Sequence, residues 1–177
     1  MNKKIEELIN LLNESQREIA IKIWDKYKKE FEILPGSISK HQAWPGGYKN
    51  HIEEVMNIAI LLYGTLSKER KLSFSLTSAL FILFLHDLDK LERYTSDGDN
   101  GFKRERTYEN LIDTLKEMLS IDFEYILTDE EYNALKYIHG EGNDYSLDKK
   151  IMGPLAAFVH CCDTISARIW HDHGKKS

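Results

Sequence analysis

The sequence predicts an all-α protein, a single-domain helical bundle of about seven helices. Apolar residues recur at helical spacing in almost every segment of the 177-residue chain. Two segments, Ser15 to Glu18 and Thr128 to Glu131, match the capping box that begins many helices. No segment shows the strict alternation of apolar and polar residues that is typical of strands. The length suits one domain with a substantial core.

Two helices are predicted before Pro35. The first is short and amphipathic, and the second begins at Ser15 with an apolar stripe that ends near Phe31. Pro35 and Gly36 stop this second helix. We expect residues 1–34 to form a helical extension that packs on a core domain of residues 35–177.

The remaining helices are predicted from Tyr48 onward, after a loop at residues 35–47 that closes with Trp44-Pro-Gly-Gly47. Turn-forming residues 95–101 predict a flexible loop. The expected helices are 48–66, 74–94, 106–119, 128–139 with Gly140 as a C-cap, and 149–170.

Composition narrows the classes of function. The net charge of −5 argues against a surface that coats long nucleic acid. The longest apolar run, Leu76 to Leu85, is about half a bilayer span, so it predicts a buried helix and no membrane insertion. The two cysteines are adjacent, Cys161 and Cys162, and neighbouring cysteines rarely pair with each other. We therefore expect thiols in a reducing cytoplasm.

Histidines and aspartates occupy otherwise apolar faces of three predicted helices. They are His51, then the pair His86-Asp87 at the end of the most apolar stretch, then Asp163 with His160 one turn before it. Imidazole and carboxylate are ligands for divalent metals, and burying them unpaired would cost a few kcal/mol. Metal sites in helical bundles are assembled from ligands on facing helices in this way.

In this order the motifs resemble those of the HD-domain superfamily of metal-dependent phosphohydrolases. The matching segments are Gly46-Gly-Tyr-Lys-Asn-His51, His86-Asp-Leu-Asp-Lys90 and the distant Asp163. The resemblance implies that His51, His86, Asp87 and Asp163 bind the metal. It also implies that Lys90 lies near a substrate phosphate. Asp87 can in addition accept a proton, because a carboxylate can bind a metal through one oxygen and leave the other free. Asp89 stands where the family usually has glycine, as a carboxylate able to pair with Lys90 or to repel phosphate.

Nitrogen and oxygen donors together suit one divalent transition metal, namely Mn, Fe, Co, Ni or Zn, with Mg left open. Such an ion acidifies a water and polarises a phosphoryl oxygen. The family usually has a further histidine soon after the His-Asp segment, and residues 103–118 contain none, so the resemblance implies one metal rather than two. His139 is a candidate for substrate binding, although a histidine at a helix end has a simpler explanation in the helix dipole. Further substrate-binding candidates are Arg104, Arg106 and Arg168.

The expected activity is hydrolysis of a phosphate ester or anhydride, by a metal-activated water, in a nucleotide or short oligonucleotide. Two alternatives stay open: a non-catalytic nucleotide or metal sensor on the same fold, and a helical interaction module. A homodimer is equally open. His160 is expected to support the ligands or fill the core, and His41 is expected at the surface.

Overall fold

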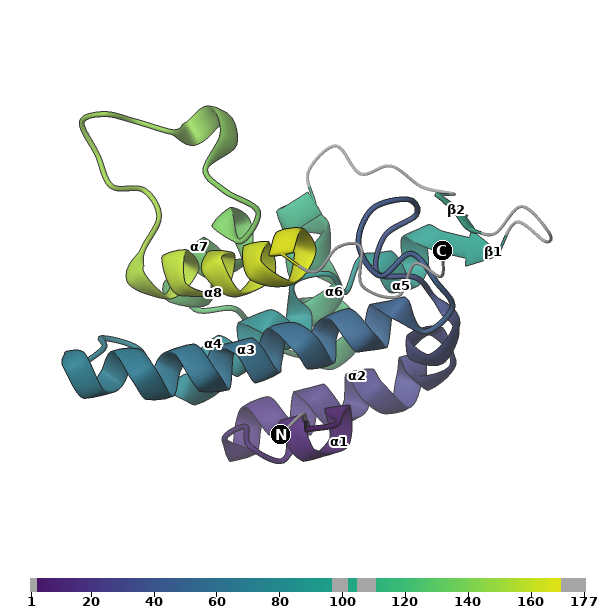
Figure 1. The fold of residues 1–177 in the computed structure, drawn as a ribbon. Helices are drawn as coiled ribbons and strands as arrows, with labels where there is room; N and C mark the ends of the chain where they lie inside the picture. Colours follow the sequence, from purple (N-terminus) through teal and green to yellow (C-terminus); the bar gives the residue numbers. More distant parts are fainter. Residues whose placement is uncertain (1–2, 97–101, 105–110, 170–177) are drawn as a thin grey trace.

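A computed structural model describes residues 3–96, 102–104 and 111–169 and confirms the all-α bundle (Figure 1). This part of the chain contains seven α-helices of five or more residues, the single-turn helix α5, and one small sheet. The bounds are α1 Ile5–Ile9, α2 Glu14–Ile33, α3 Gly47–Glu69, α4 Leu76–Leu85, α5 Lys90–Arg93, β1 Tyr94–Ser96, β2 Phe102–Arg104, α6 Leu111–Phe123, α7 Asp129–Tyr137, η2 Gly142–Asp144, α8 Pro154–Thr164 and the π-helical turn η3 Ile165–Ile169.

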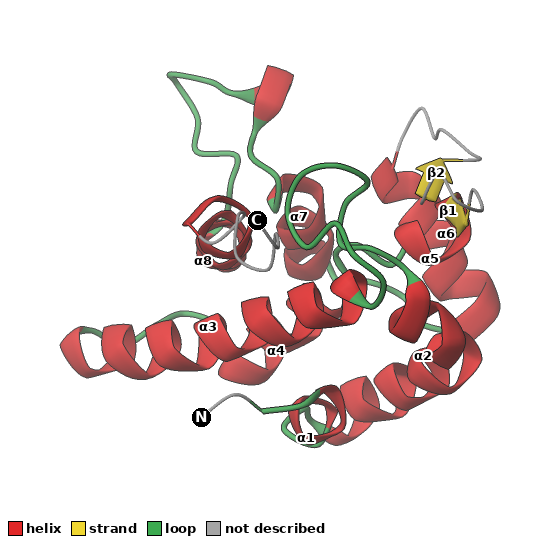
Figure 2. Cartoon of the chain, turned by 45° about the vertical axis from the view of Figure 1, so that its right-hand side comes forward, coloured by secondary structure: helices red, strands yellow, loops and turns green. Residues whose placement is uncertain are grey.

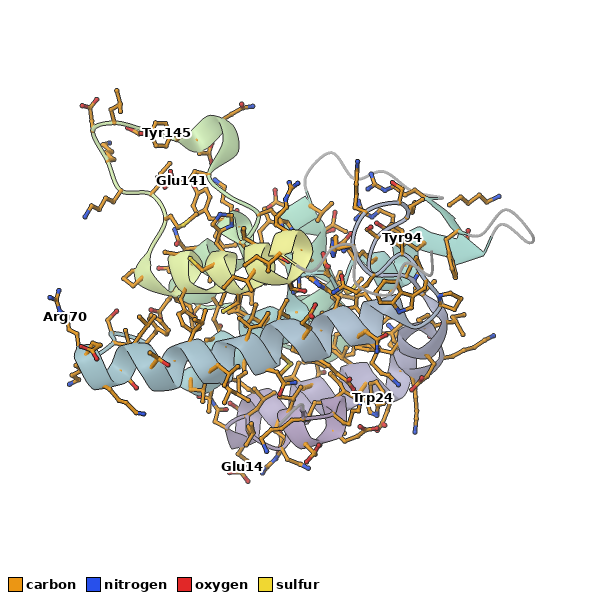
Figure 3. All side chains as sticks on the ribbon, viewed as in Figure 1. Glu14, Trp24, Arg70, Tyr94, Glu141 and Tyr145 are labelled. Carbon is orange, nitrogen blue, oxygen red and sulfur yellow. The ribbon has the colours of Figure 1, made fainter. Side chains whose placement is uncertain are left out.

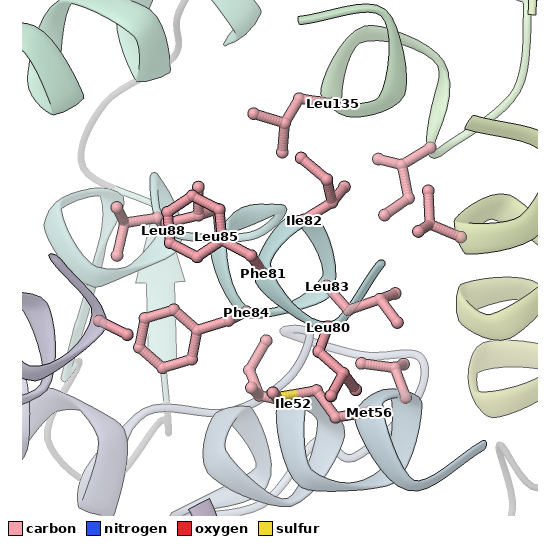
Figure 4. Close-up of a cluster of buried hydrophobic side chains, with 14 of the residues drawn as sticks. Ile52, Met56, Leu80, Phe81, Ile82, Leu83, Phe84, Leu85, Leu88 and Leu135 are labelled. Carbon is pink, nitrogen blue, oxygen red and sulfur yellow. The ribbon is translucent and has the colours of Figure 1, made fainter. Parts of the chain in front are cut away.

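Helix α4 forms the centre of the bundle. Every side chain from Ala79 to Leu85 is fully buried, because α2, α3, α7 and α8 all contact this helix. Figure 4 shows Phe81, Phe84 and their neighbours among side chains of the surrounding helices. A helix that is apolar all round has to be buried, and each such large side chain contributes about 1.5–3 kcal/mol. Because α4 is held on all sides, the position of the residues that directly follow it, His86 and Asp87, is fixed within the bundle.

The N-terminal helices pack on this core, as Figure 2 shows for α1 and α2 beside α3 and α4. Buried Phe31 of α2 meets Tyr48 of α3 edge-on, with ring centroids 4.8 Å apart. Glu53 of α3 accepts a hydrogen bond from the backbone nitrogen of Ile5 at 3.1 Å. This bond satisfies one of the free donors at the start of α1.

Two predicted helix starts are wrong. Helix α2 is capped by Asn13, whose side chain accepts from the nitrogen of Gln16, rather than by Ser15. The last helix begins at Pro154 instead of residue 149, with proline at its first position, where a missing N–H costs nothing. The cap at Thr128 is confirmed. The predicted helix start at Arg106 lies outside the described residues, which resume at Leu111.

The predicted helix 74–94 is interrupted at residues 86–89. Helix α4 ends at Leu85, and backbone bonds from Leu88 to Leu85 and from Lys90 to Asp87 tighten the chain into a turn before α5. Such bonds of the i to i+3 type belong to a tighter helix than the α-helix. The His86-Asp87 pair therefore lies in a turn, not within a continuous helix.

The small sheet was not predicted. Strand β1 pairs antiparallel with β2, with Tyr94 opposite Arg104. Strands of three residues are too short to show an alternating pattern, and residues 97–101 of the predicted loop lie outside the described residues.

The connection between α7 and α8 projects from the helical body, and Figure 3 labels Glu141 and Tyr145 on it. Among the residues described, no helix combines the length and apolar character needed to cross a membrane.

Candidate metal centre

Three helical segments bring the four predicted ligands together. His51 comes from the first turns of α3, His86 and Asp87 from the turn after α4, and Asp163 from the last turn of α8. All four residues are buried. Helices α3, α4 and α8 contact one another in the core, and the same contacts hold the four side chains close together.

The distances between the donor atoms fit a coordination sphere. Nε2 of His51 lies 3.2 Å from Nε2 of His86 and 3.2 Å from Oδ1 of Asp163. Oδ2 of Asp87 lies 3.3 Å from Nε2 of His86 and 3.6 Å from Nε2 of His51. Ligands about 2.0–2.1 Å from an ion, at tetrahedral or octahedral angles, are separated by roughly 2.9–3.4 Å. His51, His86 and Asp87 therefore each offer one donor atom to a single ion, and Asp163 lies beside them, with Oδ1 3.7 Å from Nε2 of His86.

Both histidines use their other ring nitrogen as a donor. Nδ1 of His86 donates to the carbonyl of Leu83 at 2.7 Å. Nδ1 of His51 lies 3.0 Å from Oγ of Ser166, whose own proton goes to Glu54 at 2.6 Å, so Ser166 accepts from His51. A neutral imidazole that donates from Nδ1 keeps a lone pair on Nε2. Two such lone pairs therefore face each other across 3.2 Å.

The carboxylates stay charged despite their burial. Burial opposes ionisation of Asp87, but the charge of Lys90 and the nearby His86 outweigh it and hold the pKa well below its usual value. Burial likewise opposes ionisation of Asp163, and its close contacts with His139 and His51 outweigh burial and lower the pKa.

Burial lowers the pKa of His51, whereas at His86 the charge of Asp87 outweighs burial and raises the pKa. With both rings neutral, Asp87, Asp163 and Lys90 leave one net negative charge in contact around the histidines.

Lys90 is engaged within the protein. Its ammonium group donates to Oδ2 of Asp87 and, at 2.7 Å, to the carbonyl of Gly36, and the residue is only 7% exposed. Lys90 was predicted to face a substrate phosphate. Its ammonium group instead links the 35–46 loop, through Gly36, to the candidate ligand Asp87. Asp89 pairs with Arg93 at 2.7 Å, so its ion pair is with α5's arginine and not with the neighbouring lysine.

His139 lies at the accessible edge of the site. Its side chain is 53% exposed, and Nδ1 lies 3.2 Å from Oδ2 of Asp163, the oxygen that does not face His51. Its ring centroid is 5.8 Å from that of His86. The imidazole is therefore open to solvent at the edge of the site, and its contact with a substrate stays a prediction.

The structure describes two of the three predicted basic residues, Arg104 and Arg168. The guanidinium of Arg104 lies over the ring of Tyr94, 5.9 Å from its centroid. Arg168 is exposed on η3, the turn that follows Asp163. Arg106 lies outside the described residues. Nδ1 of His160 donates a hydrogen bond to the backbone carbonyl of Ile138 at 2.6 Å, and His160 is not one of the candidate ligands.

Four further residues border the site: His41, Gln42, Glu54 and Ser166. His41 was predicted at the surface, but its half-buried ring packs edge-on against His51, with centroids 4.7 Å apart. Burial and the neighbouring His51 lower its pKa to about 4. Spacing could have indicated two of these residues, because Glu54 follows His51 by three positions and Ser166 follows Asp163 by three, which places each pair on one helix face.

Comparison with known proteins gave no match: no model of a protein family, no curated sequence and no solved structure corresponds to this chain. The resemblance to HD-domain proteins therefore depends on the order of the motifs alone.

Proposed function

We propose that the protein is a metal-dependent phosphohydrolase that cleaves a phosphate ester or anhydride in a nucleotide or short oligonucleotide. The observation that supports a metal is the pair of facing Nε2 atoms of His51 and His86, 3.2 Å apart, with both Nδ1 atoms already donating elsewhere. Two buried carboxylates beside this pair add negative charge.

A metal ion would satisfy this cluster. A proton on one Nε2 is shared with the facing nitrogen or with a neighbouring carboxylate, whereas a divalent ion would bind a donor atom of His51, His86 and Asp87 at the same time. Two nitrogen and two oxygen donors suit Mn, Fe, Co, Ni or Zn, while Mg prefers oxygen ligands and is the weaker candidate.

When bound, the ion would supply acidified water and polarise a phosphoryl oxygen. The side chains contribute the rest. Lys90 balances the charge of Asp87, and Asp163 orients His139 through its second oxygen. His139 is exposed enough to hydrogen-bond a substrate oxygen or to exchange a proton with it.

The choice of a nucleotide substrate comes from the resemblance to HD-domain proteins and from the acidic net charge of −5, which disfavours long nucleic acid. We further propose a cytoplasmic location, because both cysteines are free thiols.

A sensor without turnover is the second candidate. The observation in its favour is Lys90, whose ammonium group is buried against Asp87 and Gly36 and so does not present its charge to a phosphate.

Metal analysis tests the site. Purified protein, reconstituted with Mn, Co, Ni or Zn and then desalted, should retain about one ion per chain. His86→Ala should lose the ion, whereas the matched control His160→Ala should keep it, because His160 contacts only the Ile138 carbonyl among the contacts described. Equal, negligible metal in all three proteins would refute the site.

Turnover separates the two functions. Release of phosphate or nucleoside would be measured with nucleotides, cyclic nucleotides and short oligonucleotides, with each metal added in turn. Metal-dependent release that is lost in His86→Ala supports the hydrolase, and stoichiometric metal without release from any compound supports the sensor.

A further inference from the structure

A buried chain of hydrogen bonds lies on the Nδ1 side of His51. Nδ1 of His51 donates to Oγ of Ser166 at 3.0 Å, and this hydroxyl donates to Oε2 of Glu54 at 2.6 Å. Nε2 of Gln42 donates to the same carboxylate oxygen at 2.5 Å and to Oγ of Ser166 at 3.3 Å. Ser166 and His51 are fully buried, and Gln42 is 5% exposed.

The directions of these bonds follow from the donors available. The carboxylate of Glu54 only accepts, so the single proton of Ser166 goes to it. Both lone pairs of the hydroxyl then accept, one from His51 and one from the amide of Gln42. Each group in the chain acts only as a donor or acceptor that its chemistry allows, so the neutral His51 ring must carry its proton on Nδ1.

We propose that Ser166 and Glu54 are positioning residues, which hold the His51 imidazole with its Nε2 lone pair directed at the metal. As far as the metal is concerned, this inference rests on the proposed function. A metal-ligating histidine commonly donates its second nitrogen to an oxygen, and removing that partner typically weakens metal binding 10–100-fold.

The same two helices supply ligand and support. Helix α3 carries His51 and, three residues later, Glu54, while Asp163 near the end of α8 is followed three residues later by Ser166. The segment 165–169 is π-helical, a rare conformation that is frequent at functional sites. Asp163 and Ser166 thereby contact opposite nitrogens of one imidazole, at 3.2 and 3.0 Å.

Gln42 joins the 35–46 loop to this unit. Its carbonyl accepts from the nitrogen of Gly36 at 2.9 Å, and the carbonyl of Gly36 accepts from Lys90 at 2.7 Å. Gln42 holds a left-handed backbone conformation, with φ of 41°, which is unusual for a residue other than glycine. The loop is therefore bonded at Gln42 to Glu54 and Ser166, and at Gly36 to Lys90.

The test compares Ser166→Ala with Ser166→Thr, which restores a hydroxyl, and with Thr164→Ala, an exposed control two positions earlier at the end of α8. Affinity for Zn and Co would be measured by competition with a chelator. The tautomer of His51 would be measured in the metal-free protein from its ring ¹⁵N shifts. Ser166→Ala should bind metal 10–100-fold more weakly and mix the two tautomers, whereas the other two variants should stay within about threefold of wild type.

The inference would be overturned if Ser166→Ala bound Zn and Co as tightly as wild type and kept the same His51 tautomer. Wild-type protein that binds no metal would instead refute the proposed function, and the ¹⁵N shifts alone would then decide whether Ser166 sets the tautomer. If Ser166→Ala does not fold, Glu54→Gln at a partly exposed position carries the same comparison, with a smaller loss of affinity and the same mixing of tautomers expected.

Discussion

Nε2 of His51 lies 3.2 Å from Nε2 of His86, and each ring donates its only neutral-state proton in another direction. Two lone pairs at this distance repel each other unless a cation lies between them. Because the backbones of α3 and of the turn after α4 are fixed by a core of fully buried side chains, the rings cannot simply move apart. In this tautomer the fold holds two lone pairs face to face, a contact that a shared proton or a bound metal ion would relieve.

Metal should for this reason stabilise the protein strongly. At a free metal concentration 100 times the dissociation constant, a ligand specific for the native state adds about 2.7 kcal/mol. For a domain of this size that corresponds to a rise in Tm of about 5–10 °C. Thermal unfolding in chelator and in Zn or Co would measure the shift. His51→Gln should show none, whereas His160→Gln should keep it, and an equal rise in both variants would indicate non-specific binding.

Replacing Lys90 should weaken the metal-free protein more than the metal-bound one. In Lys90→Met the buried carboxylate of Asp87 loses its ammonium partner, which typically costs about 3–5 kcal/mol. A bound divalent ion would compensate the same carboxylate, so the loss should then be smaller while the metal content stays near one ion. Urea unfolding with and without metal gives both values.

Lys49→Met is the matched control for this prediction. Nζ of Lys49 pairs with Glu32 at 2.6 Å near the surface, so its loss should cost under about 1 kcal/mol in either condition. If Lys90→Met lost its metal, Lys90 would be needed for metal binding itself, and its role would not be limited to balancing the charge of Asp87.

The sequence was sufficient to predict which histidines and aspartates meet at the candidate metal centre. Buried helices project residues of one face toward the core, so histidines and aspartates on the apolar faces of three helices had to meet inside the bundle. His51 and Asp163 lie together for this reason, and Asp87 reaches them from the turn that follows the buried helix α4. The cap at Thr128 was also predictable, because it depends on local spacing alone.

Features that depend on distant contacts were not predictable. Leu-Asp-Lys-Leu-Glu after Asp87 favours a continuous helix by propensity, yet the chain turns at residues 86–89. The burial of Lys90 depends on the path of the 35–46 loop, which approaches it across 54 positions of sequence. His41 lacks any local pattern, and its contact with His51 arises only from that loop path.

The ion pair of Asp89 with Arg93 should stabilise the turn without affecting the metal. Both side chains are largely buried, and Asp89→Ala leaves a guanidinium unpaired, so we expect a loss of about 3 kcal/mol. Burial and the neighbouring Asp87 raise the pKa of Asp89, which moderates this loss. Arg93→Met in the Asp89→Ala background should recover part of the stability. Urea unfolding of the four proteins gives the coupling, and strictly additive losses would show that the pair contributes nothing.

His41 should make the metal-free protein sensitive to mild acid. Its pKa is about 4 in the folded protein and about 6.5 when unfolded, so the unfolded chain binds more protons between these values. The stability linked to neutral His41 is therefore fully present above about pH 6.5 and is lost as the pH falls to about 4. Urea unfolding in chelator between pH 7 and pH 4.5 should show a shallower decline for His41→Gln than for wild type, although both still lose the contribution of their ionised aspartates. Parallel declines would mean that His41 is protonated as readily in the folded protein as in the unfolded chain, and so that its ring is not held against His51 in solution.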